Sequence, residues 1–311
     1  MMKKLRGLWD LMRLGHGIML ALAIIVGAVI AARELFGPLA LDTFFLRFIS
    51  TYWVKIILTF FTALSLEAST FALNDYYDVE IDRKNKRTDR PLVRGDLSPK
   101  IAVYLFAVFF PLGIICSYFV NLTCFLIALI TALFAIFYDA VLKKIKLLGN
   151  FFIAYIMAIP FVFGGAAVLQ QGNTLDVNLN PAIFIIALIA FLAGAGREIM
   201  KDVMDFEGDL QKGVRSFPRY LGTRKSNMIA AVFYLIAIGL SFLPFFFQGY
   251  GVYYQNLPYF ILVFLTDAML LSTSLQLIIK KKPDMKFYRN YTLLALFIGL
   301  LAFLVGAFMG G

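Results

Sequence analysis

Nine long apolar stretches dominate the chain, and segments of this kind have few ways to fold. Each approaches or exceeds the roughly 20 residues that an α-helix needs to cross the hydrocarbon core of a bilayer. The expected spans cover residues 15–33, 51–73, 101–119, 121–138, 150–169, 182–200, 226–247, 257–279 and 290–309. Only 15% of the residues are charged, against about 25% in a typical soluble domain. The sequence therefore predicts an all-α, polytopic membrane protein.

The positive charge lies on alternate connections between the expected spans. Of the 29 Lys and Arg residues, 26 lie before the first span or at the connections after spans two, four, six and eight, and the others are Arg33, Arg47 and Lys55. Because positive charge marks the cytoplasmic side, the N-terminus is expected on the cytoplasmic side of the cell membrane and the C-terminus on the outer side. The net charge of +10 thus does not indicate nucleic acid. It indicates a cytoplasmic face that also meets anionic lipid headgroups.

Two acidic segments follow spans two and six, at the expected cytoplasmic ends. Motif one, residues 74–82, reads NDYYDVEID, and motif two, residues 202–209, reads DVMDFEGD. Both have the spacing D-x-x-D-x-x-x-D, formed by Asp75, Asp78 and Asp82 and by Asp202, Asp205 and Asp209. Steps of three and seven residues return to one face of a helix. Each motif is therefore expected to present three carboxylates in one stripe, with Glu80 and Glu207 off it and solvated.

Three like charges on one face repel and resist desolvation near a membrane, so a bound cation explains them best. Oxygen ligands without His or Cys indicate a hard cation, Mg²⁺ before the softer metals, and Asn74 can add a neutral oxygen. Mg²⁺ in such sites shares its positions with substrate phosphates. Two facing acidic helices could hold two or more ions that bridge a diphosphate. Simple capping or solvation of helix ends suits one such segment better than two in the same register.

These motifs resemble those of the UbiA superfamily of intramembrane prenyltransferases. That family carries N-D-x-x-D-x-x-x-D after its second span and D-x-x-x-D after its sixth, here with an additional leading Asp202. The resemblance extends to DRKNKRTDRPLVRG (82–95) and YDAVLKKIKLLGN (138–150) and covers most of the chain. It implies nine transmembrane helices around a central cavity, as one prenyltransferase domain over residues 1–311.

The resemblance also implies site residues. Metal and diphosphate would be held by Asn74, Asp75, Asp78, Asp82, Asp205 and Asp209, with Asp202 added on spacing. Lys143 would contact the diphosphate, and Asn150, Arg83 and Arg90 would bind substrate, although headgroup binding or solvation explains the two arginines equally well. Tyr138 would stabilise a developing allylic cation with its ring, or belong to the interfacial aromatic belt.

Residues 196–222, GREIMKDVMDFEGDLQKGVRSFPRYLG, are most similar to the branch that builds archaeal ether lipids. The Arg197–Glu198 and Lys201–Asp202 pairs carry this likeness. It implies Mg²⁺-dependent transfer of a geranylgeranyl group from geranylgeranyl diphosphate to the free hydroxyl of geranylgeranylglyceryl phosphate, with no obligate protein partner. An aromatic acceptor, as in the quinone branches, stays open.

A cation transporter with an acidic vestibule is the alternative from another class of protein. Transport would place ionisable residues near the bilayer midplane, often in broken helices. The middles of the expected spans carry only Glu67 and Asp267. The distribution of charge therefore favours an enzyme whose polar site lies at the membrane surface.

Overall fold

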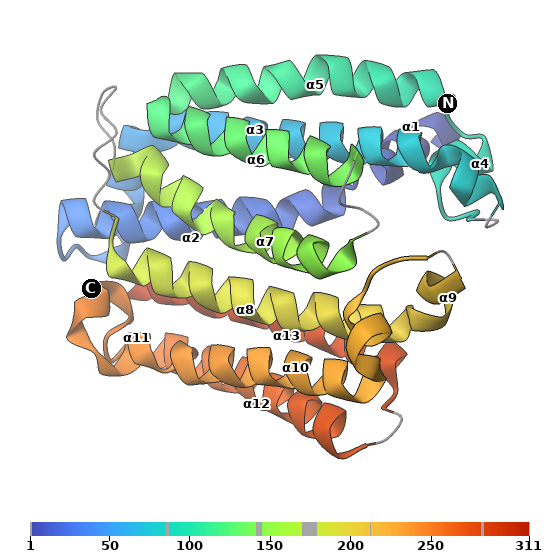
Figure 1. Cartoon of the computed structure of the whole chain (residues 1–311). Helices are drawn as coiled ribbons and strands as arrows, with labels where there is room; N and C mark the ends of the chain where they lie inside the picture. The colour runs from blue at the N-terminus through green and yellow to red at the C-terminus, as the bar shows by residue number, and fades with distance from the viewer. Residues whose placement is uncertain are drawn as a thin grey trace. The chain divides into compact units, whose positions relative to one another are not determined.

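The computed structural model describes residues 2–84, 87–140, 145–169, 179–211, 213–280 and 283–310. Across these ranges the regular structure is helical without a strand, and nine helices are long and apolar enough to cross a membrane (Figure 1). The predicted fold class, all-α and polytopic, is confirmed. The central cavity implied by the resemblance stays a prediction.

The helices begin and end at the following residues: α1 Met2–Met12, α2 Leu14–Phe36, α3 Leu41–Lys84, α4 Pro91–Arg94, α5 Pro99–Val120, α6 Leu122–Ala140, α7 Lys146–Leu169, α8 Pro181–Met204, α9 Phe206–Gln211, α10 Phe217–Ser241, α11 Leu243–Phe246, η2 Gln248–Tyr253, α12 Leu257–Ile279 and α13 Met285–Met309.

Helix α3 is longer than the span predicted at 51–73. It begins at Leu41, where Phe44 and Phe48 are buried, stack on each other and extend the apolar face toward the N-terminus. It continues to Lys84 and carries all of motif one beyond the predicted end of the span. A single helix thus connects the membrane-spanning segment to the first acidic stripe.

The chain divides into two compact units. The described part of unit 1 is residues 2–21, 52–84 and 87–139. Unit 2 comprises Leu22–Thr51 and the described residues from Ala140 to Gly310 outside unit 1. Motif one lies in unit 1 and motif two in unit 2. The expectation of one prenyltransferase domain over residues 1–311 stays a prediction.

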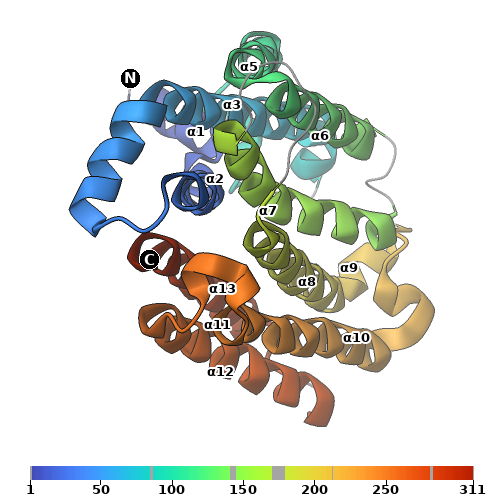
Figure 2. The ribbon, with the colours of Figure 1, turned by 90° about the vertical axis from the view of Figure 1, so that its left-hand side faces the viewer.

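Unit 2 is built around α8, which packs against α7, α10 and α13, while α12 packs against α10 and α13 (Figures 1 and 2). Ile199 and Met200 on α8, Tyr234 on α10 and Leu270 on α12 are buried together in its core. Ile199 and Met200 lie three and two residues before Asp202, so the cluster anchors the end of the helix from which motif two emerges.

Small residues let α2 and α7 approach closely within unit 2. A Cβ atom built at Gly27 would collide with the carbonyl of Phe161, and one built at Gly164 with the carbonyl of Ile24. Small residues at helix interfaces are a general device for close packing in membranes. Because α7 begins at Lys146, this contact helps to fix the helix that supplies side chains to motif two.

Arg33, one of the basic residues outside the alternate pattern, has partners within unit 2. Arg33 is buried, donates hydrogen bonds to the carbonyls of Leu39, at 2.8 Å, and Phe308, and lies 3.9 Å from the ring centroid of Phe44. Its guanidinium thereby satisfies a carbonyl in the last turn of α13, where a cation is favourable. Arg33 is thus explained by packing rather than by topology.

Candidate active site

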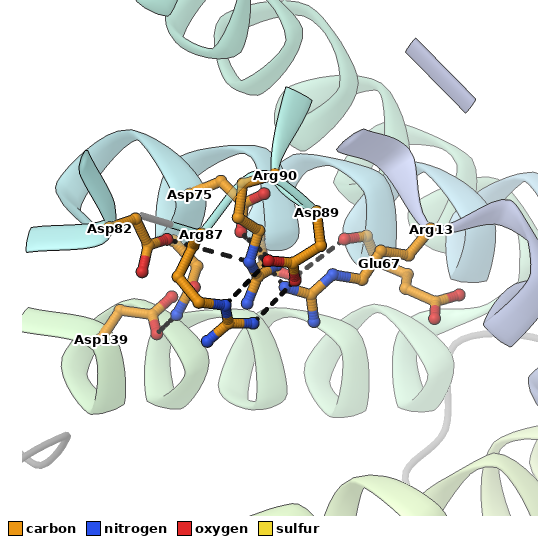
Figure 3. Close-up of polar contacts among 10 residues, drawn as sticks. Arg13, Glu67, Asp75, Asp82, Arg87, Asp89, Arg90 and Asp139 are labelled. Atoms are coloured by element: carbon orange, nitrogen blue, oxygen red, sulfur yellow. Dashed lines mark hydrogen bonds and ion pairs between the residues drawn. The ribbon is translucent and has the colours of Figure 1, made fainter. Parts of the chain in front are cut away.

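Motif one keeps the helical register that its spacing predicts. Asp75 and Asp82 are buried and Asp78 is partly buried, whereas Tyr76 and Glu80 are exposed. The three carboxylates come from the last three turns of α3, and those of Asp75 and Asp82 point toward Arg90 (Figure 3). The prediction that the aspartates form one stripe, with Glu80 solvated, is confirmed for this motif.

Two arginines contact the same oxygen of Asp75. The Arg13 guanidinium lies 3.2 Å and that of Arg90 2.9 Å from Asp75 Oδ1, and Arg90 Nε is 3.8 Å from Asp82 Oδ2 (Figure 3). Asp75 is only 2% exposed, so its charge requires such partners. Arg90 was predicted as a substrate-binding residue, and the structure places it directly on motif one.

The two arginines are positioned by one helix pair. Arg13 follows the last residue of α1, where it adopts a positive φ of 48°, and Arg90 is the N-cap of α4. Helices α1 and α4 pack through Leu11 and Leu92, and Arg94 of α4 lies 2.8 Å from Asp10 of α1. A positive φ is unfavourable for a side chain of this size, so the packing of this pair holds Arg13 where it meets Asp75.

Asn74 pairs with a carboxylate that the sequence did not single out. Its Nδ2 donates a hydrogen bond to Asp139 Oδ1 at 2.6 Å (Figure 3). This bond does not use the amide oxygen, the atom predicted as a metal ligand. Asp139 stands at the end of α6, directly after Tyr138, which is partly buried. The end of α6 that carries Tyr138 therefore lies beside the start of motif one.

The remaining basic residues near motif one are more exposed. Arg83 is exposed, and Arg87 forms two hydrogen bonds to Asp89 at 2.9 and 2.8 Å (Figure 3). The Arg87 guanidinium lowers the pKa of Asp89 to about 2. Because this pair is largely solvated, it contributes little to stability. Lys143, the predicted diphosphate contact, lies outside the described residues.

Motif two departs from the predicted register. Helix α8 ends at Met204, Asp205 is its C-cap with φ −91° and ψ 4°, and α9 begins at Phe206. The expectation that all three aspartates share one uninterrupted helix is therefore wrong. Helix α9 has no buried residue, so beyond Met204 there is no packed apolar face to hold a continuous helix. As predicted, Glu207 is exposed.

Side chains from the first turns of α7 meet motif two. Asn150 Nδ2 donates to Asp202 Oδ2 at 2.7 Å, and Lys146 Nζ lies 3.5 Å from Asp202 Oδ1 and 2.7 Å from Asp209 Oδ2. Asp202 is 2% exposed, whereas Asp205 is exposed. Lys146 was not predicted from the sequence. Its i, i+4 spacing from Asn150, which puts both on one face of α7, was the available signal.

The donor atoms fit a hard cation. Asp75 Oδ2 is buried without a hydrogen-bond partner in the described part of the chain, and an unsatisfied buried carboxylate oxygen is a ready ligand. No three acidic, His or Cys side chains of the described residues gather as a complete metal cage. Mg²⁺ does not need one, because it is commonly held by one or two carboxylates, waters and substrate phosphates.

Comparisons with known proteins decide the family. The model of the UbiA prenyltransferase family matches residues 20–301. The chain belongs to the UbiA prenyltransferase family. It is 38% identical over 305 residues to digeranylgeranylglyceryl phosphate synthase of Archaeoglobus fulgidus, covering 98% of this chain and 96% of that one. The family prediction made from the two acidic motifs is confirmed, and the chain is accordingly a prenyltransferase.

Solved structures show the same fold. A structure of digeranylgeranylglyceryl phosphate synthase in membranes matches with a TM-score of 0.74 and 31% identity over 98% of this chain and 99% of that one. A UbiA homologue from Archaeoglobus fulgidus bound to DMAPP and Mg²⁺ matches with a TM-score of 0.55 and 16% identity over 95% and 98% of the chains. The fold of these solved structures therefore covers nearly the whole length of this chain.

Proposed function

We propose that this UbiA-family chain catalyses Mg²⁺-dependent transfer of a geranylgeranyl group from geranylgeranyl diphosphate to the free hydroxyl of geranylgeranylglyceryl phosphate. The observation that carries the proposal is that each acidic motif holds cationic side chains beside its carboxylates, Arg13 and Arg90 in motif one and Lys146 in motif two. Carboxylates suit Mg²⁺, and guanidinium or ammonium groups suit phosphate oxygens. A site of mixed charge is what a metal–diphosphate pair requires.

The metal ligands in this proposal are Asn74, Asp75, Asp78, Asp82, Asp205 and Asp209. When bound, Mg²⁺ neutralises the diphosphate and stabilises it as a leaving group. The UbiA homologue bound to DMAPP and Mg²⁺ supports Mg²⁺ as the ion and an isoprenyl diphosphate as the prenyl donor. Arg13 and Arg90 lie on Asp75 and would meet diphosphate oxygens at that carboxylate with up to five N–H donors each. Lys143 and Arg83 keep the diphosphate-binding role that the family resemblance implies.

The transfer step breaks the C1–O bond of the donor, and its electron pair leaves with the diphosphate. The acceptor hydroxyl oxygen then forms a bond to C1, and its proton passes to a basic oxygen of the site, a carboxylate or the departing diphosphate. Tyr138 faces the developing allylic cation in this proposal, where an aromatic ring is stabilising. Exclusion of bulk water by the surrounding helices prevents capture of that cation. The apolar chains of donor and acceptor remain among the helices or in lipid.

The choice of acceptor rests on the relatives named digeranylgeranylglyceryl phosphate synthase, one of them 38% identical over 98% of this chain. The test is an acceptor panel with the purified protein in nanodiscs and radiolabelled geranylgeranyl diphosphate. We expect labelled ether lipid from geranylgeranylglyceryl phosphate and no labelled product from an aromatic quinone precursor. A prenylated aromatic product without ether lipid contradicts the proposal and supports the quinone-type alternative.

Cation transport fits the observed contacts less well. Asp267, one of the two acidic residues in the middle of a span, is buried and accepts a hydrogen bond from Ser241 Oγ at 2.6 Å, a contact that packs α12 on α10. Cation flux in proteoliposomes that persists in Asp78→Ala and Asp205→Ala, without diphosphate release by the wild type, would favour transport instead.

Both motifs are placed at the cytoplasmic face of the cell membrane in this proposal, with the C-terminus outside. The basic connections support that orientation. Single cysteines at Arg215 and Gly249, both exposed, test it in a chain whose Cys116 and Cys124 are replaced by Ala. We expect a membrane-impermeant maleimide to label intact cells at Gly249→Cys and not at Arg215→Cys; the reverse pattern refutes the orientation.

A further inference from the structure

Asp202 differs from the other aspartates of motif two in having both carboxylate oxygens engaged. Oδ2 accepts from Asn150 Nδ2 at 2.7 Å, and Oδ1 lies 3.5 Å from Lys146 Nζ. The side chain is 3% exposed. A buried carboxylate is stable when it is paired and hydrogen-bonded, and Asp202 meets this condition through protein atoms alone.

The other two aspartates of motif two are more open. Asp205 is exposed at the C-cap of α8, and Asp209 is partly buried on α9, where its Oδ2 lies 2.7 Å from Lys146 Nζ. Lys146 therefore bridges Asp202, which is fully engaged by protein atoms, and Asp209, which is more exposed. The family motif itself, D-x-x-x-D, corresponds to Asp205 and Asp209, with Asp202 as an additional residue.

We infer that Asp202 is a positioning residue rather than a metal ligand. Together with Asn150 it positions the Lys146 ammonium group beside the other carboxylates of motif two. This inference rests on the proposed function and refines it. The Lys146 ammonium is held beside Asp209, a proposed ligand, so it contacts the diphosphate bound there. Asn150, expected from the family resemblance to bind substrate, instead fixes the carboxylate that fixes the lysine.

The geometry of α7 supports this arrangement. Lys146 is the first residue of α7 and Asn150 lies one turn later, so both approach Asp202 from the same helix face. Asn150 is itself buried, which restricts its rotamers and leaves little freedom for Asp202 Oδ2. Such a fixed partner orients the flexible lysine side chain before the diphosphate binds. Without it, the side chain would lose considerable rotamer entropy when the diphosphate binds.

The test compares two double variants of the full chain in nanodiscs, Asp202→Asn with Lys146→Met and Asp209→Asn with Lys146→Met. Each removes one negative and one positive charge, so the two differ only in which aspartate is lost. Binding of Mn²⁺, a spectroscopic substitute for Mg²⁺, is measured by electron paramagnetic resonance. We expect the Asp202 double variant to bind Mn²⁺ within about threefold of wild type and the Asp209 double variant at least about tenfold more weakly.

A second measurement follows the affinity for a non-hydrolysable thiolodiphosphate analogue of the donor. Asp202→Asn and Lys146→Met should each weaken it by a similar factor, and their combination should weaken it no further, because both act through one ammonium group. Asn150→Ala, which keeps both charges, should show the same loss with unchanged Mn²⁺ affinity. This variant keeps the test valid if Asp202→Asn fails to fold.

Two outcomes would overturn the inference. A loss of Mn²⁺ affinity in the Asp202 double variant as large as in the Asp209 double variant would make Asp202 a ligand. Unchanged affinity for the analogue in Asp202→Asn, with a loss in Lys146→Met, would separate the two residues. Neither measurement uses an acceptor, so a failure of the proposed acceptor reaction is distinguishable from a failure of this assignment.

Discussion

Replacing Asp78 or Asp205 by Ala is expected to lower prenyl transfer by at least about 10²–10³-fold while leaving the fold intact. Asp78 is partly buried and Asp205 exposed, so loss of either carboxylate removes a proposed metal ligand without leaving a deeply buried charge unpaired. Turnover is followed as diphosphate release and labelled product, and folding as helicity and thermal unfolding in the same nanodiscs.

The chain offers matched controls for these variants. Glu80 and Glu207 lie in the same two motifs, are exposed, and stand off the aspartate spacing. Glu80→Ala and Glu207→Ala should therefore retain near wild-type turnover. Retained activity in both aspartate variants would refute the metal site. Equal losses of activity in the glutamate controls would show that any acidic residue at these helix ends matters, and not the aspartates specifically.

Asp75 differs from Asp78 because its buried ion pairs also contribute to the stability of the fold. Its side chain is 2% exposed and faces both Arg13 and Arg90. Removing it leaves two guanidinium groups without this carboxylate, and breaking a buried ion pair from one side is destabilising. Loss of activity in Asp75→Ala therefore mixes chemistry with folding, and Asp78 gives the clearer measurement in motif one.

Removal of divalent metal is expected to have an effect of similar size. Treatment with EDTA should reduce transfer by at least about 100-fold, and excess Mg²⁺ should restore it, because the proposed carboxylates cannot neutralise a diphosphate themselves. Ca²⁺ should restore less, since it is larger and takes more ligands in a looser geometry than Mg²⁺. The measurement is diphosphate release at fixed donor concentration, titrated with each cation.

A structural readout accompanies the kinetic one. The donor analogue should raise the thermal unfolding temperature when Mg²⁺ is present and raise it less after EDTA, because ligand bound to the folded state alone stabilises it by mass action. Transfer that persists in EDTA, together with metal-independent stabilisation by the analogue, would contradict a metal-bridged diphosphate.

Much of this protein follows from local sequence patterns. Apolar length alone predicts the nine spans, and the three- and seven-residue steps from Asp75 predict the stripe on α3, because both properties depend on neighbouring residues. Motif two has the same spacing, yet its helix ends at Met204. Spacing describes a face only where packing supports a helix, and α9 has no buried residue to provide that support.

The cations and the additional carboxylate could not be found in this way. Arg13 is 62 residues from Asp75, Lys146 is 63 from Asp209 and Asp139 is 65 from Asn74. These pairs form because tertiary packing brings together the ends of helices that are distant in the sequence. The packing of α1 on α4, which brings Arg13 and Arg90 to one carboxylate oxygen, leaves no periodic signal in the sequence.

The stoichiometry of a single reaction in nanodiscs tests directly whether the protein transfers a geranylgeranyl group to the lipid-phosphate acceptor. Purified protein, geranylgeranyl diphosphate labelled in the isoprenoid chain, geranylgeranylglyceryl phosphate and Mg²⁺ are combined, and both diphosphate and labelled lipid are quantified over time. We expect one labelled digeranylgeranyl ether lipid for each diphosphate released, and neither product without the acceptor. Diphosphate release that yields only geranylgeraniol, or no release with this acceptor, would contradict it.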